Sequence, residues 1–122
     1  MTDDRILDYC LSKPGAYVCF PFGDMPVCVK VKNRLFAQVY EDKATFSCTV
    51  EAGMFWRDLY PGTVTRGYHC PPVQQPYFNT VMFSAAVPDE ELYAMADHSY
   101  ETVVHRLSKK LREELEREKA TK

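Results

Sequence analysis

Hydrophobic residues recur at helical spacing over the C-terminal third of the chain. Pro88 and the acidic residues 89–91 suit the first turn of a helix, where no N–H is needed and negative charge meets the positive end of the helix dipole. An apolar stripe then follows at steps of three and four residues: Leu92, Met95, Ala96, Ser99, Val103 and Leu107. The pattern predicts a long helix over residues 88–107. Residues 108–110 break or bend it before Leu111 and Leu115 continue the stripe.

Upstream, the pattern predicts a second, N-terminal helix. Thr2 is placed to cap a helix that ends at Leu11, with acidic residues in its first turn. The sequence Lys13-Pro14-Gly15 ends this helix, because proline disfavours helix in the residue before it and glycine permits a left-handed turn. Residues 16–22 fit only an edge strand, since Pro21 interrupts them.

The middle of the chain predicts the rest of an antiparallel sheet. Residues 26–32 and 34–41 flank Lys32-Asn33, a pair suited to a tight hairpin turn. Residues 44–50 alternate, which predicts that Ala44, Phe46, Cys48 and Val50 face inward and that Thr45, Ser47 and Thr49 face outward. Residues 54–60 predict a short helix, residues 63–76 a long connection and residues 77–84 the last strand.

This order of elements predicts an α+β fold, in which an antiparallel sheet is flanked by an N-terminal helix and a long C-terminal helix. We expect one domain over residues 1–122. The net charge of −2 gives no overall basic character that would suggest nucleic acid or an acidic membrane. No apolar run reaches the roughly 20 residues that span a bilayer, and the N-terminus lacks the features of a signal peptide. We therefore expect a cytoplasmic protein with no membrane partner.

The residue types that usually carry catalysis or metal binding are not arranged for it. The five cysteines, Cys10, Cys19, Cys28, Cys48 and Cys70, form no Cys-x-x-Cys pair and are predicted to be reduced, buried thiols. His98 and His105 are two helical turns apart, too far to share one ion. No Gly-rich phosphate loop, nucleophile elbow or His-Glu-x-x-His sequence is present. We predict no catalytic residues, no metal and no cofactor.

Short motifs stand in order along nearly the whole chain. The first are Asp8-Tyr9-Cys10, Lys13-Pro14-Gly15-Ala16 and Pro21-Phe22-Gly23. The next are Leu35-Phe36-Ala37, Trp56-Arg57, Tyr60-Pro61-Gly62 and Gly67-Tyr68-His69. The last are Asn79-Thr80-Val81, Pro88-Asp89-Glu90-Glu91-Leu92 and Asp97-His98-Ser99-Tyr100. As an ordered set, they resemble the MmcQ/YjbR family of small bacterial proteins.

The resemblance implies a fold similar to that of the frataxin-like CyaY proteins and of secretion chaperones. It also implies the family's usual label, a DNA-binding protein. The chain departs from the family after Gly67-Tyr68-His69, where the family tends to run Met-Asn-Lys and then His-Trp before Asn-Thr-Val. Here a longer, Pro-rich segment, residues 70–78, fills that space without the lysine or the second histidine. Contacts made by those two residues in the family therefore cannot be carried over.

Two functions of different class are compatible with these patterns, and neither is enzymatic. The leading one is binding of double-stranded DNA with low sequence specificity. Lys30, Lys32 and Arg34 cluster at the hairpin tip, with Arg66 and His69 on a nearby loop, and such cations contact phosphates. The same charges also fit an exposed hairpin that they keep soluble and protect from pairing with other chains.

The alternative function is a protein-interaction or chaperone-like adaptor module with no nucleic-acid role. Its surface would be the sheet face and the Pro-rich loop, which carry aromatic side chains of the kind found in interface cores: Phe36, Tyr40, Tyr77 and Phe78. These rings fit the protein's own core equally well. Aromatic content alone does not separate the two readings.

Overall fold

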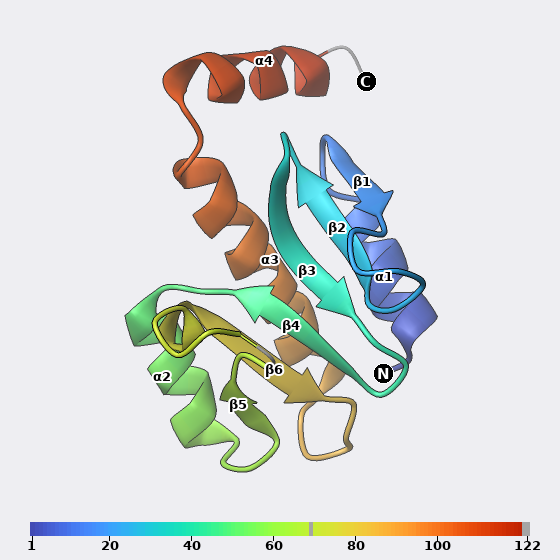
Figure 1. Ribbon diagram of the computed structural model, residues 1–122, viewed down its shortest axis with the longest axis vertical. Helices are drawn as coiled ribbons and strands as arrows, with labels where there is room; N and C mark the ends of the chain where they lie inside the picture. The colour runs from blue at the N-terminus through green and yellow to red at the C-terminus, as the bar shows by residue number, and fades with distance from the viewer. Residues whose placement is uncertain (69, 121–122) are drawn as a thin grey trace.

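The computed structural model describes residues 1–68 and 70–120 as one antiparallel sheet with helices (Figure 1). Its strands are β1 (Ala16–Cys19), β2 (Val27–Val31), β3 (Arg34–Val39), β4 (Lys43–Ser47), β5 (Val64–Arg66) and β6 (Phe78–Met82). Its helices are α1 (Asp3–Leu11), α2 (Val50–Leu59), α3 (Asp89–His105) and α4 (Lys109–Ala120), with a short 3₁₀ helix, η1 (Gln75–Tyr77). The predicted α+β fold is confirmed.

The sheet has the strand order β1-β2-β3-β4-β6-β5, and all neighbouring strands are antiparallel. The predicted hairpin joins β2 to β3 through Lys32 and Asn33, whose φ angles are 46° and 61°. A two-residue turn with both φ angles positive matches the twist of the strands that it joins. The register shifts between Val29 and Lys30, so one strand of this hairpin carries a bulge.

Helices α1 and α3 cover one face of the sheet and lie behind it in Figure 1. The whole predicted stripe of α3 is buried, together with Leu107 just beyond it. Ser99 Oγ donates a hydrogen bond to the carbonyl of Phe36 at 2.5 Å, and the Phe36 ring meets Tyr100 edge-on with centroids 5.4 Å apart. Ser99, the polar residue in this apolar stripe, therefore attaches α3 to β3 through its hydrogen bond.

The end of α1 is attached to α3 by side chains of the first and last motifs. Tyr9 Oη donates a hydrogen bond to Asp97 Oδ1 at 2.7 Å, and the Lys13 ammonium is ion-paired with the same oxygen. Tyr100 Oη donates to the carbonyl of Pro14 at 2.6 Å. Contacts between segments more than 80 residues apart in sequence thus fix the turn that leads into β1.

A break follows α3 at residues 106–108, and α4 then lies across the end of the β2–β3 hairpin (Figure 1). Leu115, the residue that continues the apolar stripe, is fully buried. It packs on Gly15, whose φ is +75°, and a Cβ at that position would lie 2.7 Å from Leu115 Cδ1. Lys32 Nζ contacts Glu118 Oε1 at 2.5 Å and Glu114 Oε2 at 3.5 Å.

Three expectations need correction. The segment predicted as a long connection contains β5, which pairs with β6. Val50 starts α2 instead of ending a strand, because Thr49 Oγ1 accepts a hydrogen bond from the Ala52 N–H and caps the helix. Thr45 and Ser47 were expected to face outward, and they do lie on the sheet face opposite α1 and α3, but they are only 1% and 3% exposed.

Candidate binding groove on the open sheet face

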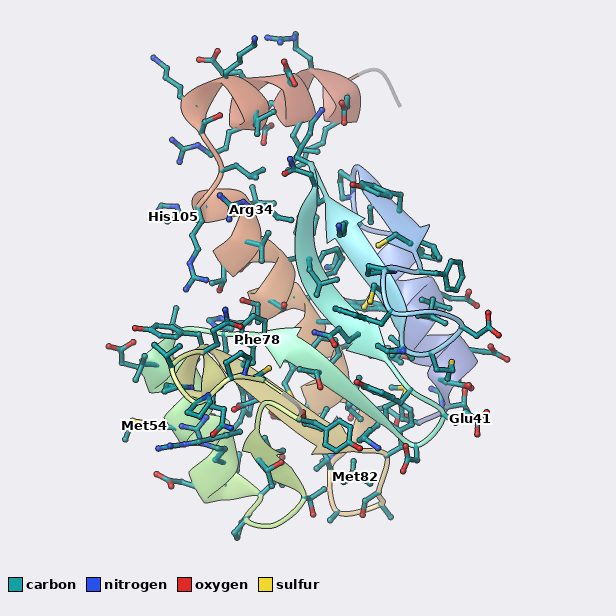
Figure 2. All side chains as sticks on the ribbon, viewed as in Figure 1. Arg34, Glu41, Met54, Phe78, Met82 and His105 are labelled. Atoms are coloured by element: carbon teal, nitrogen blue, oxygen red, sulfur yellow. The ribbon has the colours of Figure 1, made fainter. Side chains whose placement is uncertain are left out.

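We call the sheet face opposite α1 and α3 the open face. Its strand positions follow from the alternation with core residues and from the register of directly opposed pairs. They are Tyr17, Cys19, Cys28, Lys30, Leu35, Gln38, Lys43, Thr45, Ser47, Thr65, Phe78, Thr80 and Met82. Figure 2 labels Phe78 and Met82 at the two ends of β6. The charged residues of this set are Lys30 and Lys43, so its charge is positive.

A groove of about 620 Å³ lies on this face, and we call it the open-face groove. Its first wall comes from the β1–β2 connection: Phe22, Met25 and Pro26. Its floor comes from β3 and the residue after it: Leu35, Gln38 and Tyr40. Its second wall comes from the loop before β6 and from the start of that strand: Tyr68, Cys70, Pro71, Gln74 and Phe78.

The second wall is held against the sheet by hydrogen bonds and by a close approach at glycine. The Tyr68 N–H donates to Thr80 Oγ1 at 2.7 Å. Gln75 Nε2 donates to the Cys70 carbonyl at 3.1 Å, within the loop itself. A Cβ on Gly67 would lie 2.6 Å from Cys70 Sγ, so this turn requires a residue without a side chain. The Pro-rich segment is therefore an ordered wall.

The groove has neutral polar groups inside and a cation at its rim. Burial raises the pKa of the Tyr40 hydroxyl and of the Cys70 thiol, so both stay protonated at neutral pH. Lys43 Nζ lies 4.5 Å from the ring centroid of Tyr68 and 4.9 Å from that of Tyr40. It also contacts Asp42 Oδ1 at 3.2 Å, a carboxylate that is itself largely exposed.

Large apolar side chains remain exposed around the groove, on both of its walls. Phe22 and Met25 on the first wall are 64% and 39% exposed, and Phe20, just before this wall in sequence, is 56% exposed. Val73 and Tyr77, which belong to the loop of the second wall but lie outside the groove lining, are 79% and 44% exposed. A groove with exposed apolar side chains on and beside its walls commonly marks a place where another molecule binds.

The structure separates the residues predicted to contact DNA. Lys32 is occupied by the two α4 carboxylates, while Lys30 lies on the open face between Tyr17 and Leu35. Arg34 is exposed at the start of β3, and Arg66 is exposed on β5, which two strands separate from β3 in the sheet. His69 lies outside the described residues. The expected cluster at the hairpin tip is therefore divided among three surroundings.

One cationic pair was missed by the sequence analysis. Arg34 and Arg106 line the same small cavity, about 170 Å³, together with Ser47 and Phe78. In the described part of the chain, neither guanidinium is ion-paired with a carboxylate. Arg106 follows the last residue of α3, and only tertiary packing brings it to the start of β3.

The residues predicted for protein interaction fall into two groups. Tyr40 and Phe78 line the groove, and Tyr77 is exposed beside it on η1. Phe36 is only 1% exposed and belongs to the core, so the structure removes it from the expected interface. Phe22 and Met25 were missed. Phe22 had been assigned to the edge strand 16–22, and Met25 lies between the turn residues Gly23-Asp24 and Pro26, where a large apolar side chain has no partner in the local pattern.

Several motif residues bond one another away from the groove. Arg57 Nη1 donates to Asn79 Oδ1 at 2.6 Å, and Asn79 Nδ2 donates to the Gly53 carbonyl at 3.2 Å. Trp56 Nε1 donates to Glu91 Oε2 at 3.0 Å. These bonds attach α2 to β6 and to α3. Trp56, Arg57, Asn79 and Glu91, which belong to the motifs of the family resemblance, therefore help to hold the scaffold together.

The described ranges 1–68 and 70–120 contain no group of three or more His, Cys, Asp or Glu side chains placed to hold a metal ion. Within the same ranges, no helix is long and apolar enough to cross a membrane. All five cysteines are free thiols. The groove lining offers apolar contact and hydrogen bonding through amides and hydroxyls, and Lys43 at its rim attracts negative charge.

Comparisons with known proteins give relatives of similar length. The chain is 25% identical over 112 residues to the uncharacterized protein YjbR of Escherichia coli K12, which covers 92% of this chain and 95% of that protein. The YjbR protein of Escherichia coli O157:H7 matches with the same figures.

Solved structures share the fold. The crystal structure of a Deinococcus radiodurans protein with a DUF419 domain has a TM-score of 0.82 at 27% identity, covering 93% of this chain and 87% of that one. A Pseudomonas syringae protein has a TM-score of 0.68 at 12% identity, covering 84% and 99%, which shows the fold alone. The YjbR family model matches residues 11–102. The resemblance found in the motifs is confirmed, and the chain belongs to the YjbR family.

Proposed function

We propose that this protein is a non-enzymatic, cytoplasmic binding module whose open-face groove holds an extended apolar segment of a protein partner. The observation that carries the proposal is the groove of about 620 Å³ with exposed apolar side chains on both walls. A small molecule inside it would leave Phe20, Val73 and Tyr77 in water, because they lie outside the lining. A peptide that crosses both walls would cover them.

The positive charge of the open face favours a partner segment with acidic side chains. Lys30 and Lys43 are the charged strand positions on this face, and Lys43 stands at the groove rim over two tyrosine rings. Acidic side chains beside the partner's apolar residues would meet these ammonium groups, whereas basic ones would be repelled. The proposed segment therefore alternates apolar and acidic residues.

The groove's polar groups support binding in preference to catalysis. Burial raises the pKa of the Cys70 thiol and of the Tyr40 hydroxyl further above neutral pH, so Cys70 is a poor nucleophile and Tyr40 does not act as a general base there. The other polar side chains in the lining include the amides of Gln38 and Gln74, which bind and orient but do not exchange protons near neutral pH.

The test is a fluorescence-anisotropy titration with labelled ten-residue peptides. The first alternates Leu or Phe with Glu, the second replaces Leu and Phe by Ser, and the third replaces Glu by Lys. We expect only the first to bind. Phe22→Ser should weaken its binding by about tenfold, whereas the matched variant Phe55→Ser should not. Phe55 is 60% exposed, as Phe22 is 64% exposed, but it lies on α2 outside the groove. Equal effects of both variants, or no binding of the first peptide, would refute the groove proposal.

Low-specificity binding of double-stranded DNA is the second candidate, favoured by the pairing of Arg34 with Arg106. The same assay with a labelled mixed-sequence duplex, at about 50 and 200 mM salt, tests it. DNA binding should weaken steeply with salt and with Arg34→Ala plus Arg106→Ala, and it should be insensitive to Phe22→Ser. Absence of binding at low salt would end this candidate.

A further inference from the structure

Two cysteines face each other at the base of the first groove wall. Cys19 ends β1 and Cys28 lies near the start of β2, and the register pairs them directly. Directly opposed residues of antiparallel strands have side chains on the same face, so both thiols lie on the open face. Residues 20–27 connect them and include Phe22 and Met25 of the groove wall.

The geometry of such a pair suits a disulfide. Directly opposed residues have Cα atoms roughly 4.5 to 5.5 Å apart, within the roughly 4.4 to 6.8 Å that disulfides span. Cys28 is fully buried, and Cys19 is half-buried, so an oxidant can reach Cys19 first. The pKa of Cys28 is raised to about 11, mainly by burial and then by the neighbouring Cys19, which agrees with close thiols.

The other cysteines are placed less well for this chemistry. Cys10 is fully buried in the core beneath α1, and Cys48 is 2% exposed at the start of the connection to α2. Cys70 is half-buried but lies on the opposite wall of the groove. Cys19 and Cys28 are the cysteines paired in the strand register.

We propose that Cys19 and Cys28 are a peroxide-sensitive thiol pair that closes reversibly into a disulfide. The Cys19 thiolate attacks one oxygen of hydrogen peroxide, the O–O bond breaks, one water leaves and Cys19 becomes a sulfenic acid. The Cys28 sulfur then loses its proton and attacks the Cys19 sulfur, which forms the S–S bond and releases a second water. Two thiols have lost two electrons and two protons, and the peroxide has taken up both. A dithiol reductant reverses the step.

Closure would change the groove wall. The disulfide ties the two ends of residues 20–27 together and so reduces the conformations open to Phe22 and Met25. A transient bond of this kind is compatible with a reducing compartment. This inference stands on the register and the burial of the two thiols, and it holds whether or not the groove binds a peptide.

The first experiment treats the full-length protein with a small molar excess of hydrogen peroxide and blocks the remaining thiols with N-ethylmaleimide. Digestion without reduction uses an endoprotease that cuts before Asp24, between the two cysteines. We expect two peptides linked across this cut, lost in Cys19→Ser, retained in Cys70→Ser and separated by dithiothreitol. A link that survives Cys19→Ser, or irreversible oxidation of Cys19 without a link, would overturn the proposal.

The second readout is the rate at which chymotrypsin cuts after the exposed Phe22. We expect the oxidised protein to be cut at least about threefold more slowly, because fewer open conformations are available. Dithiothreitol should restore the rate, and Cys19→Ser should be cut at one rate with or without peroxide. An unchanged rate in the cross-linked protein would refute the stiffening of the wall.

Discussion

At the scale of single residues, His98 connects α3 to the start of α2. Its Nε2 accepts a hydrogen bond from the Thr49 N–H at 3.1 Å and lies 3.3 Å from Thr102 Oγ1. Accepting from an N–H requires a neutral ring with its proton on Nδ1. Burial lowers the pKa of His98, with Glu101 acting against this and Arg106 adding to it.

Acid should therefore destabilise the protein through His98. Its pKa is lower in the folded than in the unfolded chain, so the unfolded chain binds more protons as the pH falls. The stability that the neutral ring contributes is present above about pH 6.5, and it is lost as the pH falls through the folded pKa. Between about pH 8 and 5, we expect wild type to lose on the order of 1 kcal/mol more than His98→Gln, the value of one hydrogen bond.

Urea unfolding followed by circular dichroism at the two pH values measures this difference. Carboxylates elsewhere titrate equally in both proteins and cancel. His98 and His105 line one cavity of about 360 Å³, but His105 is exposed and does not bond to Thr49. His105→Gln is therefore the control. If wild type and His98→Gln lose equal free energy of unfolding between the two pH values, protonation of His98 does not destabilise the fold.

Residue-scale prediction from the sequence succeeded where a local period decided it. The α3 stripe was identified because burial of a helix face repeats every three or four residues. Phe36 was misassigned because a bulge interrupts the alternation, and Phe36 and its neighbour Ala37 are both in the core. The ion pairs of Lys32 were not predictable, since they join residues that are more than 80 positions apart.

At the scale of elements, α4 depends on one buried side chain. Leu115 is fully buried beside Gly15, and much of the remaining helix surface is exposed and charged. Replacing Leu115 by Ala removes this contact and leaves a cavity, so we expect a loss of roughly 2 to 5 kcal/mol in the free energy of unfolding. Urea titration measures it. Leu59→Ala, at a leucine that is 49% exposed on α2, should stay within about 0.5 kcal/mol of wild type.

A loss at Leu115 no larger than that at Leu59 would mean that α4 is not docked on the hairpin in solution. In that case Lys32 would also lack its two carboxylate partners most of the time. The hairpin tip would then regain the exposed cation that the sequence analysis predicted.

Element-scale prediction depended on how local the signal was. Lys32-Asn33 predicted the hairpin, because short polar turns tolerate positive φ. The strand β5 was missed, since its three residues form a strand only by pairing with β6. The start of α2 was placed late because alternation through Val50 outweighed the cap at Thr49. The groove could not be predicted at all, because its walls come from segments about 45 residues apart that meet only in the fold.

At the scale of the whole molecule, the positive charges are distributed over separate surfaces. Lys30 and Lys43 lie on the open face, Arg34 and Arg106 share a cavity near the end of α3, and Lys32 is held by α4. The two candidate sites therefore use different cations, although Leu35 and Phe78 line both the groove and the arginine cavity. A change of charge at the hairpin tip, which lies outside the groove lining, should leave peptide binding unaltered.

Replacing Glu114 and Glu118 together by Gln tests this separation. The double variant removes two negative charges and releases Lys32, while the groove keeps its lining. Ion pairs at the protein surface contribute little to stability, so α4 should stay folded on the hairpin. We expect the affinity for the apolar, acidic peptide to stay within about twofold of that of wild type, since Lys32 is not among the groove residues.

If DNA is bound, one added phosphate contact should tighten DNA binding and should steepen the slope of log affinity against log salt concentration by about one. Anisotropy titrations of both ligands with wild type and variant measure the two effects. If the double variant weakens peptide binding as much as Phe22→Ser does, the peptide binds at the hairpin tip, and the proposal of an open-face site is wrong.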